Sequence, residues 1–507
     1  MRKSSTNLHA LIHKLTKAEK KQCTVCLKAL GKQGEEYLNL FRQIDKQEQY
    51  DELALKRKIK TVSYSRLKRK LYALVLDTVV QAQLEEDIHS RLLYGLQKYH
   101  ALYKKELYHQ AHQLIYQLQE LAQAHHQLEL LQCINKLIIE IECNITSFEQ
   151  YDKPAFEVLM DMLFQTNEQL HNKQNYHILS ARLKYHLNKD KNFSTQKVFF
   201  NQLMKDPLLR EESHALSWPA KLQYYLLHLI IAVCSEEHDK ACECSLKIIT
   251  IYEQHFLAHA PNQQTYLSYH FNAIVCATGA LRAELCEELF SKASTLLSGN
   301  IPNSNYNKTI LLGLQFNWYT FIGDTARGFQ LLEAQEDFLA TIQATPFFIT
   351  LSISLAYLYI EVGDYDTAME HLENVLAADE QMYYTIREGA QLMLLVCYYE
   401  KQEWSLLASL SRSLYRRYQP QTAQLEAELI LVKLFQKLSK KWYSKEECCL
   451  VLKKAKNDLV LLKKQQPTAL IQLCRHFDYL SWLESHISQQ AFVDLLQKKV
   501  KLSTTVT

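Results

Sequence analysis

Four residues near the start of the chain combine metal-binding types with helical spacing. His9 and His13 are four positions apart, and Cys23 and Cys26 are three apart. Because residues three or four apart share one face of a helix, two antiparallel helices could hold a zinc ion with these four ligands. The sequence has no second Cys-x2-Cys pair, so small buried cysteines and surface histidines are the alternative interpretation. We therefore predict no metal and no other cofactor, and we keep these four residues as an alternative metal site.

A cluster of positive charge follows in the same part of the chain. Eight basic residues occur within fifteen positions, with no acidic residue among them. They are Lys56, Arg57, Lys58, Lys60, Arg66, Lys68, Arg69 and Lys70. If two short helices separated by TVSYS carry them, one helix could lie against nucleic acid and neutralise phosphates. The segment becomes strongly apolar after Lys70 and offers no set of base-reading side chains, so we favour a solvated basic face.

No catalytic arrangement is visible in the sequence. It contains no H-E-x-x-H, G-x-S-x-G, G-x-x-x-x-G-K-[ST] or G-x-G-x-x-G motif, and we predict that the protein is not an enzyme. Tyrosines are abundant, at 30, and a ring that carries a hydroxyl suits contact with a peptide. Our candidates for a partner-binding surface are Tyr357, Tyr359, Tyr398 and Tyr399. The alternative role for these tyrosines is to fill gaps between helices.

The elements that position these residues are predicted to be helices. Only 10 glycines and 8 prolines occur in 507 residues, and few helix breakers mean long helices with short connections. The clearest example is Leu355–Leu376, LAYLYIEVGDYDTAMEHLENVL. Its apolar residues recur every three or four positions on both sides of Gly363 and Asp364, which can end one helix and cap the next. This segment predicts a helical hairpin.

The hairpin pattern recurs along most of the chain. We place its small-residue position at Ala111, Ala155, Gln196, Ala241, Ala283, Gly328, Ala368, Leu407 and Glu446, with steps between 39 and 45 residues. A repeat of about 40 residues indicates stacked helix pairs, each too thin to bury its own apolar face. The predicted fold class is therefore all-α, with neighbouring hairpins sharing one core.

The residues G-D-Y-x-x-A at Gly363–Ala368, preceded by Leu355, Ala356 and Tyr359, resemble the tetratricopeptide repeat. The resemblance implies a right-handed α-solenoid of tetratricopeptide-like hairpins, with a concave groove in which successive first helices bind a protein or peptide. The step here is longer than the family's period of about 34 residues, and HEAT-like repeats have a similar length. The glycine–aspartate turn favours the tetratricopeptide family.

Charge divides the chain into three parts. Residues 1–80 carry a net charge of +10, residues 81–429 carry −15 and residues 430–507 carry +8. We predict a basic N-terminal helical domain at 1–85, the hairpin array at 86–425, and a final hairpin with basic cap helices at 426–507. The stretches LTKAEKK, YLNLFRQIDKQEQYDE and LYALVLDTV resemble the N-terminus of a group of uncharacterised cytosolic proteins from Bacteroidota. That resemblance implies no known activity.

The remaining composition predicts a cytoplasmic protein with reduced thiols. Its thirteen cysteines are odd in number and follow no recurring spacing, and the start of the chain lacks an apolar signal segment. The longest apolar runs are too short to span a membrane. The expected function is a non-enzymatic protein–protein interaction scaffold whose acidic concave groove binds a protein or peptide segment. The alternative is a transcriptional or nucleic-acid-associated regulator that combines the basic N-terminal helices with a repeat sensor domain.

Overall fold

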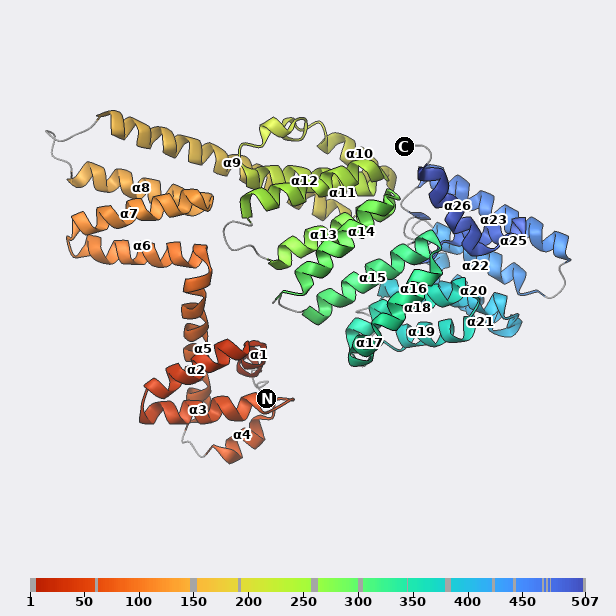
Figure 1. Ribbon diagram of the computed structural model, residues 1–507, viewed down its shortest axis with the longest axis horizontal. Helices are drawn as coiled ribbons and strands as arrows, with labels where there is room; N and C mark the ends of the chain where they lie inside the picture. The colour runs from red at the N-terminus through yellow and green to blue at the C-terminus, as the bar shows by residue number, and fades with distance from the viewer. Residues whose placement is uncertain are drawn as a thin grey trace. The chain divides into compact units, whose positions relative to one another are not determined.

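Every described element of the chain is a helix. The computed structural model describes residues 6–59, 63–145, 153–189, 193–256, 263–299, 304–343, 345–378, 384–421, 425–440, 444–466, 469–470, 473–474 and 476–504, and no strand occurs within these ranges. The all-α prediction is thus confirmed. The chain divides into two compact units, Met1–Leu170 and His171–Thr507 (Figure 1). This division differs from the predicted boundaries at residues 85 and 425, which stay predictions.

The first unit contains two apolar cores. The helices of the first core are α1 (Asn7–Lys14), α2 (Lys17–Ala29), α3 (Lys32–Asp45), α4 (Glu52–Lys58) and α5 (Tyr64–Glu86). Those of the second are α6 (Ile88–Lys104), α7 (Tyr108–Ala124) and α8 (Leu128–Ile145), followed by α9 (Lys153–Lys189). A capping box opens α2, because Glu19 N donates to Thr16 Oγ1 at 3.2 Å and Thr16 N donates to Glu19 Oε2 at 2.7 Å.

The second unit is a succession of helices, most of which pack against the next one along the chain. After α9 they are α10 (Phe193–Leu203), α11 (Trp218–Cys234), α12 (His238–Phe256), α13 (Gln263–Gly279), α14 (Ala283–Leu297), α15 (Ser304–Ile322), α16 (Thr325–Ala334), α17 (Glu336–Ile342), α18 (Pro346–Glu361), α19 (Tyr365–Ala377), α20 (Tyr384–Glu400), α21 (Trp404–Tyr418), α22 (Glu426–Leu438), α23 (Lys445–Gln465), α25 (Tyr479–Ser488) and α26 (Phe492–Thr504). All thirteen cysteines of the chain are free thiols.

Seven connections between helices share one backbone turn. In each, a residue in the left-handed region is followed by a residue whose N–H donates to the C=O five positions back, at 2.8–3.1 Å. The left-handed residues are Glu106, His126, Glu236, Leu281, Gly323, Gly363 and Gln402. This closure satisfies carbonyl groups that the end of a helix leaves unpaired. It also sets the register of the helix that follows.

As a result, the fifth residue after each left-handed residue is buried. The buried residues are Ala111, Leu131, Ala241, Cys286, Gly328, Ala368 and Leu407. The placement at Ala283 was wrong, because the turn is formed by Leu281 rather than by Gly279, which is still helical. The placement at Glu446 was also wrong, since Glu446 is exposed in the first turn of α23. The side chain of Ala155 lies outside the described residues.

The C-terminal helices fold back over helices far earlier in the chain. Asp478 N donates to Tyr357 Oη at 3.3 Å, and Gln497 Nε2 donates to Gly323 O at 3.0 Å. α26 packs against α15, and α25 packs against both α23 and α26. Residues 476–504 therefore cover part of α15, α18 and α20 rather than only extending the succession. One of the helices in the predicted basic C-terminal part is α23, which buries Leu452, Leu459 and Leu462.

The contact between α26 and the turn at Gly323 predicts unequal effects of two matched substitutions. Gly323 has φ +69°, and a Cβ there would lie 3.0 Å from Val493 O. Gly363 has φ +78°, but a Cβ there would meet no atom within 4 Å. We expect Gly323→Ala to lower the free energy of unfolding by about 2 kcal/mol and Gly363→Ala by about 1 kcal/mol, measured by urea denaturation. Equal losses would contradict the docking of α26 on this turn.

Candidate binding pocket

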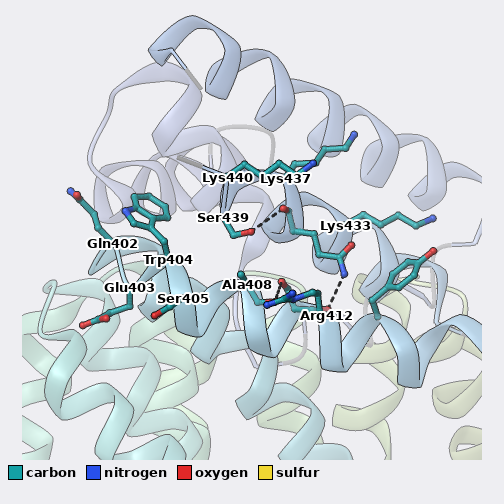
Figure 2. Close-up of a pocket in the computed structure, with 13 residues that line it drawn as sticks. Gln402, Glu403, Trp404, Ser405, Ala408, Arg412, Lys433, Lys437, Ser439 and Lys440 are labelled. Atoms are coloured by element: carbon teal, nitrogen blue, oxygen red, sulfur yellow. Dashed lines mark hydrogen bonds between the residues drawn. The ribbon is translucent and has the colours of Figure 1, made fainter. Parts of the chain in front are cut away.

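A pocket of about 1130 Å³ lies between α21 and α22 (Figure 2). Both helices present polar side chains to it, and the turn before α21 and the residues at the end of α22 also line it. The lining residues are Gln402, Glu403, Trp404, Ser405, Ala408, Ser411, Arg412, Tyr415, Lys433, Gln436, Lys437, Ser439 and Lys440. The volume is slightly above the range of about 300–1,000 Å³ that is typical of small-molecule sites. The pocket is therefore large enough for a short segment of polypeptide.

Positive charge dominates the lining of this pocket. Arg412, Lys433, Lys437 and Lys440 all contribute to it, and Glu403 is the acidic residue among those that line it. Within the part of the chain that the structure describes, none of the four cations forms a salt bridge. Arg412 Nε donates to Ala408 O at 2.9 Å, in the preceding turn of its own helix. The four positive charges are thus left for a ligand or for solvent.

The walls of the pocket are held by contacts that do not use these charges. Leu407 and Leu414 are buried on α21, and Leu434 and Leu438 are buried on α22. Gln436 Nε2 donates to Ser411 O at 3.2 Å, which ties the second wall to the first. Because apolar residues and an uncharged amide position the two helices, the cationic side chains can exchange solvent for a ligand without loss of the fold.

Two of the four predicted partner-binding tyrosines are covered by the C-terminal helices of the chain itself. Tyr357 is only 6% exposed, and its ring centroid lies 4.8 Å from that of Phe477. The ring of Tyr399 packs edge-on against Trp482, with the centroids 5.7 Å apart. For these two residues the structure favours the core-filling role. They do not face an open groove in this conformation.

The other two tyrosines are half-buried. Tyr359 lines a second pocket of about 620 Å³, and its ring stacks on His371 with the centroids 5.6 Å apart. Burial lowers the pKa of His371, so this pocket presents a neutral imidazole among mostly apolar side chains. Tyr398 packs partly against the core beside α21. A partner-binding role for Tyr359 and Tyr398 stays a prediction.

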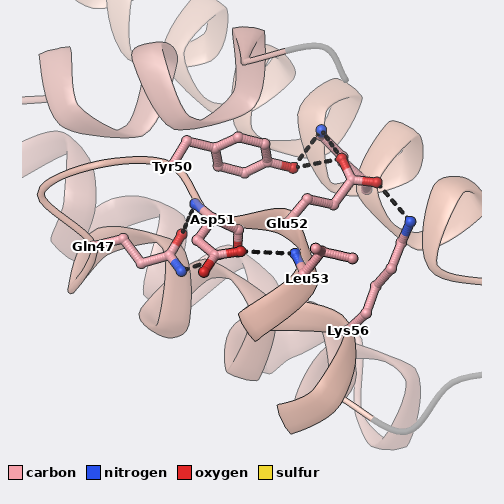
Figure 3. Close-up of polar contacts among 7 residues, drawn as sticks. Gln47, Tyr50, Asp51, Glu52, Leu53 and Lys56 are labelled. Atoms are coloured by element: carbon pink, nitrogen blue, oxygen red, sulfur yellow. Dashed lines mark hydrogen bonds and ion pairs between the residues drawn. The ribbon is translucent and has the colours of Figure 1, made fainter. Parts of the chain in front are cut away.

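In the first unit, two of the predicted nucleic-acid-binding cations are committed to one carboxylate (Figure 3). Glu52 forms a salt bridge with Lys56 at 2.7 Å and another with Lys68 at 3.2 Å. Tyr50 Oη also donates to Glu52 Oε2, at 3.0 Å. The hydrogen bond from Lys56, aided by those from Tyr50 and Lys68, lowers the pKa of Glu52 to about 2. This network connects α4 to α5 and gives Lys56 and Lys68 a structural role.

The lowered pKa of Glu52 predicts a loss of stability in acid. The folded-state pKa lies below the ordinary value of 4.5, so the stabilisation is present above pH 4.5 and is lost as the pH falls towards 2. Allowing for solvent screening, we expect Glu52→Gln to cost about 1–2 kcal/mol at pH 7 and to flatten this part of the pH profile. Urea denaturation of the full chain between pH 2 and pH 7 measures both effects. An unchanged profile in the variant would contradict the assignment.

The remaining predicted cations stay on the surface. Arg57, Lys58, Arg66, Arg69 and Lys70 are exposed, and within the described residues none of them forms a salt bridge. Lys60 lies outside the described residues. The buried face of α5 includes Leu67, Leu71 and Val75, which accounts for apolar residues within and after the basic cluster in the sequence. The arrangement fits a solvated basic face and leaves contact with nucleic acid untested.

The alternative zinc site does not form. His9 Nε2 lies 2.9 Å from Gln47 O and His13 Nε2 lies 3.3 Å from Ile44 O, so both imidazoles bind backbone carbonyl groups at the end of α3. Cys23 is fully buried, and its burial raises the pKa of the thiol. Nowhere in the described ranges do three or more His, Cys, Asp or Glu side chains group as a metal site would require. The structure therefore does not group His9, His13, Cys23 and Cys26 as metal ligands, because the histidines have other partners and Cys23 is buried.

No helix in the described part of the chain combines the length and the apolar character needed to cross a bilayer. Comparison with protein-family models, with curated proteins and with solved structures finds no match for this chain. The function must therefore be argued from the geometry of the site.

Sequence reasoning did not identify the cations that line the pocket, Arg412, Lys433, Lys437 and Lys440. Two signals were present in the sequence: the i, i+4, i+7 spacing of the three lysines and the basic charge of residues 430–507.

Proposed function

We propose that this chain is a non-enzymatic protein-interaction scaffold built from tetratricopeptide-like helical hairpins. The observation that carries the proposal is the pocket between α21 and α22, which is lined by four cations without salt-bridge partners among the described residues. Two of them, Lys433 and Lys437, also border a smaller hollow of about 200 Å³ between α22 and α23. The lining contains three serines but no histidine that could activate one of them as a general base. Such a surface is suited to holding a polypeptide segment rather than to transforming one.

Polar contacts between alternate helices support a tetratricopeptide-like arrangement. Arg282 at the start of α14 forms a salt bridge with Asp239 of α12 at 2.9 Å, and Arg327 of α16 forms one with Glu287 of α14 at 2.7 Å. In addition, the turns at residues 236, 281, 323, 363 and 402 follow one another at steps of 45, 42, 40 and 39 residues. A stack of hairpins produces both features, because equivalent helices of successive hairpins are neighbours.

The C-terminal helices favour the pocket over the inner groove as the binding site. Tyr357 and Tyr399 are covered by residues 477–492, so a partner would have to displace a well-packed part of the core to reach them. The pocket between α21 and α22 is open without any such rearrangement. The proposed site therefore differs from the acidic concave groove expected from the sequence.

Site-specific photocrosslinking tests this proposal. We would introduce a photoreactive phenylalanine at Ser405, which lines the pocket, and at Ser413, an exposed serine of the same helix outside the pocket. Irradiation of cells that produce the full chain should yield a discrete protein adduct from position 405 and none from position 413. Adducts of equal yield at both positions, or none at position 405, would refute a partner site in this pocket.

A second candidate, nucleic-acid binding by the first unit, is favoured by one observation. Arg66, Arg69 and Lys70 lie at i, i+3 and i+4 on the exposed side of α5, and none forms a salt bridge within the described residues. If this candidate is correct, the full chain should retard duplex DNA at low salt, and the triple variant Arg66→Glu, Arg69→Glu and Lys70→Glu should not. Absence of binding by the unaltered chain at low salt would remove the candidate.

A further inference from the structure

We infer that the pocket between α21 and α22 binds an acidic peptide in an extended conformation, through side-chain carboxylates of alternate residues. The inference rests on the proposed function and adds to it the chemical class of the partner segment. The charge of the proposed site is opposite to that of the acidic concave groove expected from the sequence. Three features of the pocket carry it: the spacing of the lysines, the groups on the facing wall, and the position of the acid.

The distance between Lys433 and Lys437 on α22 is close to the distance between alternate side chains of an extended peptide. Lys433, Lys437 and Lys440 line the pocket, and a rise of about 1.5 Å per residue separates the first two by about 6 Å along the helix axis. In an extended peptide, side chains on one side recur at about 6.7 Å. Two carboxylates two residues apart can therefore each meet one lysine. Lys440 follows the end of α22 and adds a third positive charge to the lining.

The wall on α21 supplies complementary groups. Arg412 offers a planar guanidinium, which can hold a carboxylate with two parallel hydrogen bonds. Trp404 and Tyr415 add aromatic surface for the aliphatic part of acidic side chains, and Ser405 and Gln402 add donors for backbone carbonyl groups. An extended segment needs such donors, because its own backbone groups are not paired within the segment.

The acidic residue of the lining does not neutralise this row. Glu403 lies at the first end of α21 beside Gln402 and points away from the lysines (Figure 2). A single inorganic anion is too small to engage Arg412 and the lysine row together in a pocket of about 1130 Å³. A nucleic acid would be recognised by phosphates along a surface groove with bases stacked on successive rings. The hydroxyl groups and the two aromatic rings of the lining favour a peptide.

Isothermal titration calorimetry on the full chain tests the inference. The probe is an acetylated and amidated peptide of four Glu-Ser repeats, so that its only charges are side-chain carboxylates. We expect saturable binding that weakens with added salt. Lys433→Gln and Lys437→Gln should each weaken binding about threefold, and the double variant about tenfold. Lys445→Gln, the same change at an exposed lysine of α23 outside the pocket, should leave binding unchanged.

Several results would overturn the inference. These are the absence of saturable binding, equal weakening by Lys445→Gln and by the pocket variants, and tighter binding of inorganic phosphate or of an eight-residue oligothymidine than of the acidic peptide. The same peptide with lysine in place of glutamate must not bind more tightly. If position 405 still yields a partner adduct while the acidic peptide fails to bind, the scaffold function stands and only the class of ligand is overturned.

Discussion

Replacing Trp482 with alanine should lower the free energy of unfolding of the second unit by about 3–5 kcal/mol. Trp482 is 2% exposed, and its ring lies against Phe435 and Tyr399, with centroid distances of 5.5 and 5.7 Å. Its Nε1 donates to Glu400 Oε1 at 2.7 Å. The substitution leaves a large cavity among residues that are far apart in sequence, and it removes one donor from a half-buried carboxylate. The expected loss in free energy of unfolding is therefore among the largest that a single substitution produces.

Urea denaturation followed by circular dichroism measures this loss, because the signal does not depend on the tryptophan that is removed. Tyr185→Ala is the matched control, since it also truncates an aromatic side chain of the second unit but at a position that is 66% exposed. We expect the control to cost less than about 1 kcal/mol. If Trp482→Ala costs no more than the control, the C-terminal helices do not belong to the core and the covering of Tyr399 has been wrongly assigned.

A gain of stability is expected from the second substitution, Glu361→Met. Glu361 is 8% exposed at the end of α18, and among the described residues neither of its carboxylate oxygens has a hydrogen-bond partner. Burial raises the pKa of Glu361 well above 4.5. Methionine has a similar length without the polar end, so the desolvation cost disappears. We expect the free energy of unfolding at pH 7 to rise by about 2–3 kcal/mol.

The raised pKa of Glu361 also predicts how the stability of the protein changes with pH. Because the folded-state pKa of Glu361 lies above the unfolded-state value, the protonated carboxyl is tolerated below pH 4.5, and stability is lost as the pH rises through the folded-state pKa. Both Glu361→Met and Glu361→Gln should abolish this loss, and the methionine variant should be the more stable because glutamine keeps an unpaired polar group. Glu373→Gln, at an exposed position of α19, should change neither quantity. A methionine variant less stable than the unaltered chain would show that Glu361 has a partner.

The fold class and several helix boundaries could be predicted from local chemistry. The scarcity of glycine and proline predicted helices throughout. Ser444 and Glu447, three positions apart, form a capping box, with Glu447 N donating to Ser444 Oγ at 3.2 Å. The break at Gly363 was predicted because glycine adopts the left-handed region at little cost. These signals act within a few residues, which is why a single sequence reveals them.

The preference of glycine for the left-handed region also explains why one helix break was misplaced from the sequence. Five of the seven turns place a residue with a side chain in the left-handed region, namely Glu106, His126, Glu236, Leu281 and Gln402. Each costs of order 1 kcal/mol, which the packing of two helices can offset, so no glycine marks the break. For this reason the register at Ala283 was displaced from Cys286.

Long-range contacts lie beyond such reasoning altogether. The contact between Asp478 and Tyr357 spans 121 residues, and nothing in either segment specifies the other. This contact, together with the packing of Tyr399 against Trp482, places two of the candidate binding tyrosines against the C-terminal segment. The pocket was missed for a related reason, because its charge comes from two helices whose facing sides are fixed by the apolar residues on their other faces. A basic row on one helix was visible, but the cation and the rings opposite it were not.

Hydrogen–deuterium exchange of the full chain, with and without the blocked Glu-Ser peptide, tests the central claim most directly. The account predicts slower exchange on binding in residues 402–415 and 433–440, the segments that line the pocket, with the rest of the described chain unchanged. Unaltered exchange in both segments at saturating peptide, or slowing confined to other helices, would contradict the claim that this chain binds a partner segment between α21 and α22.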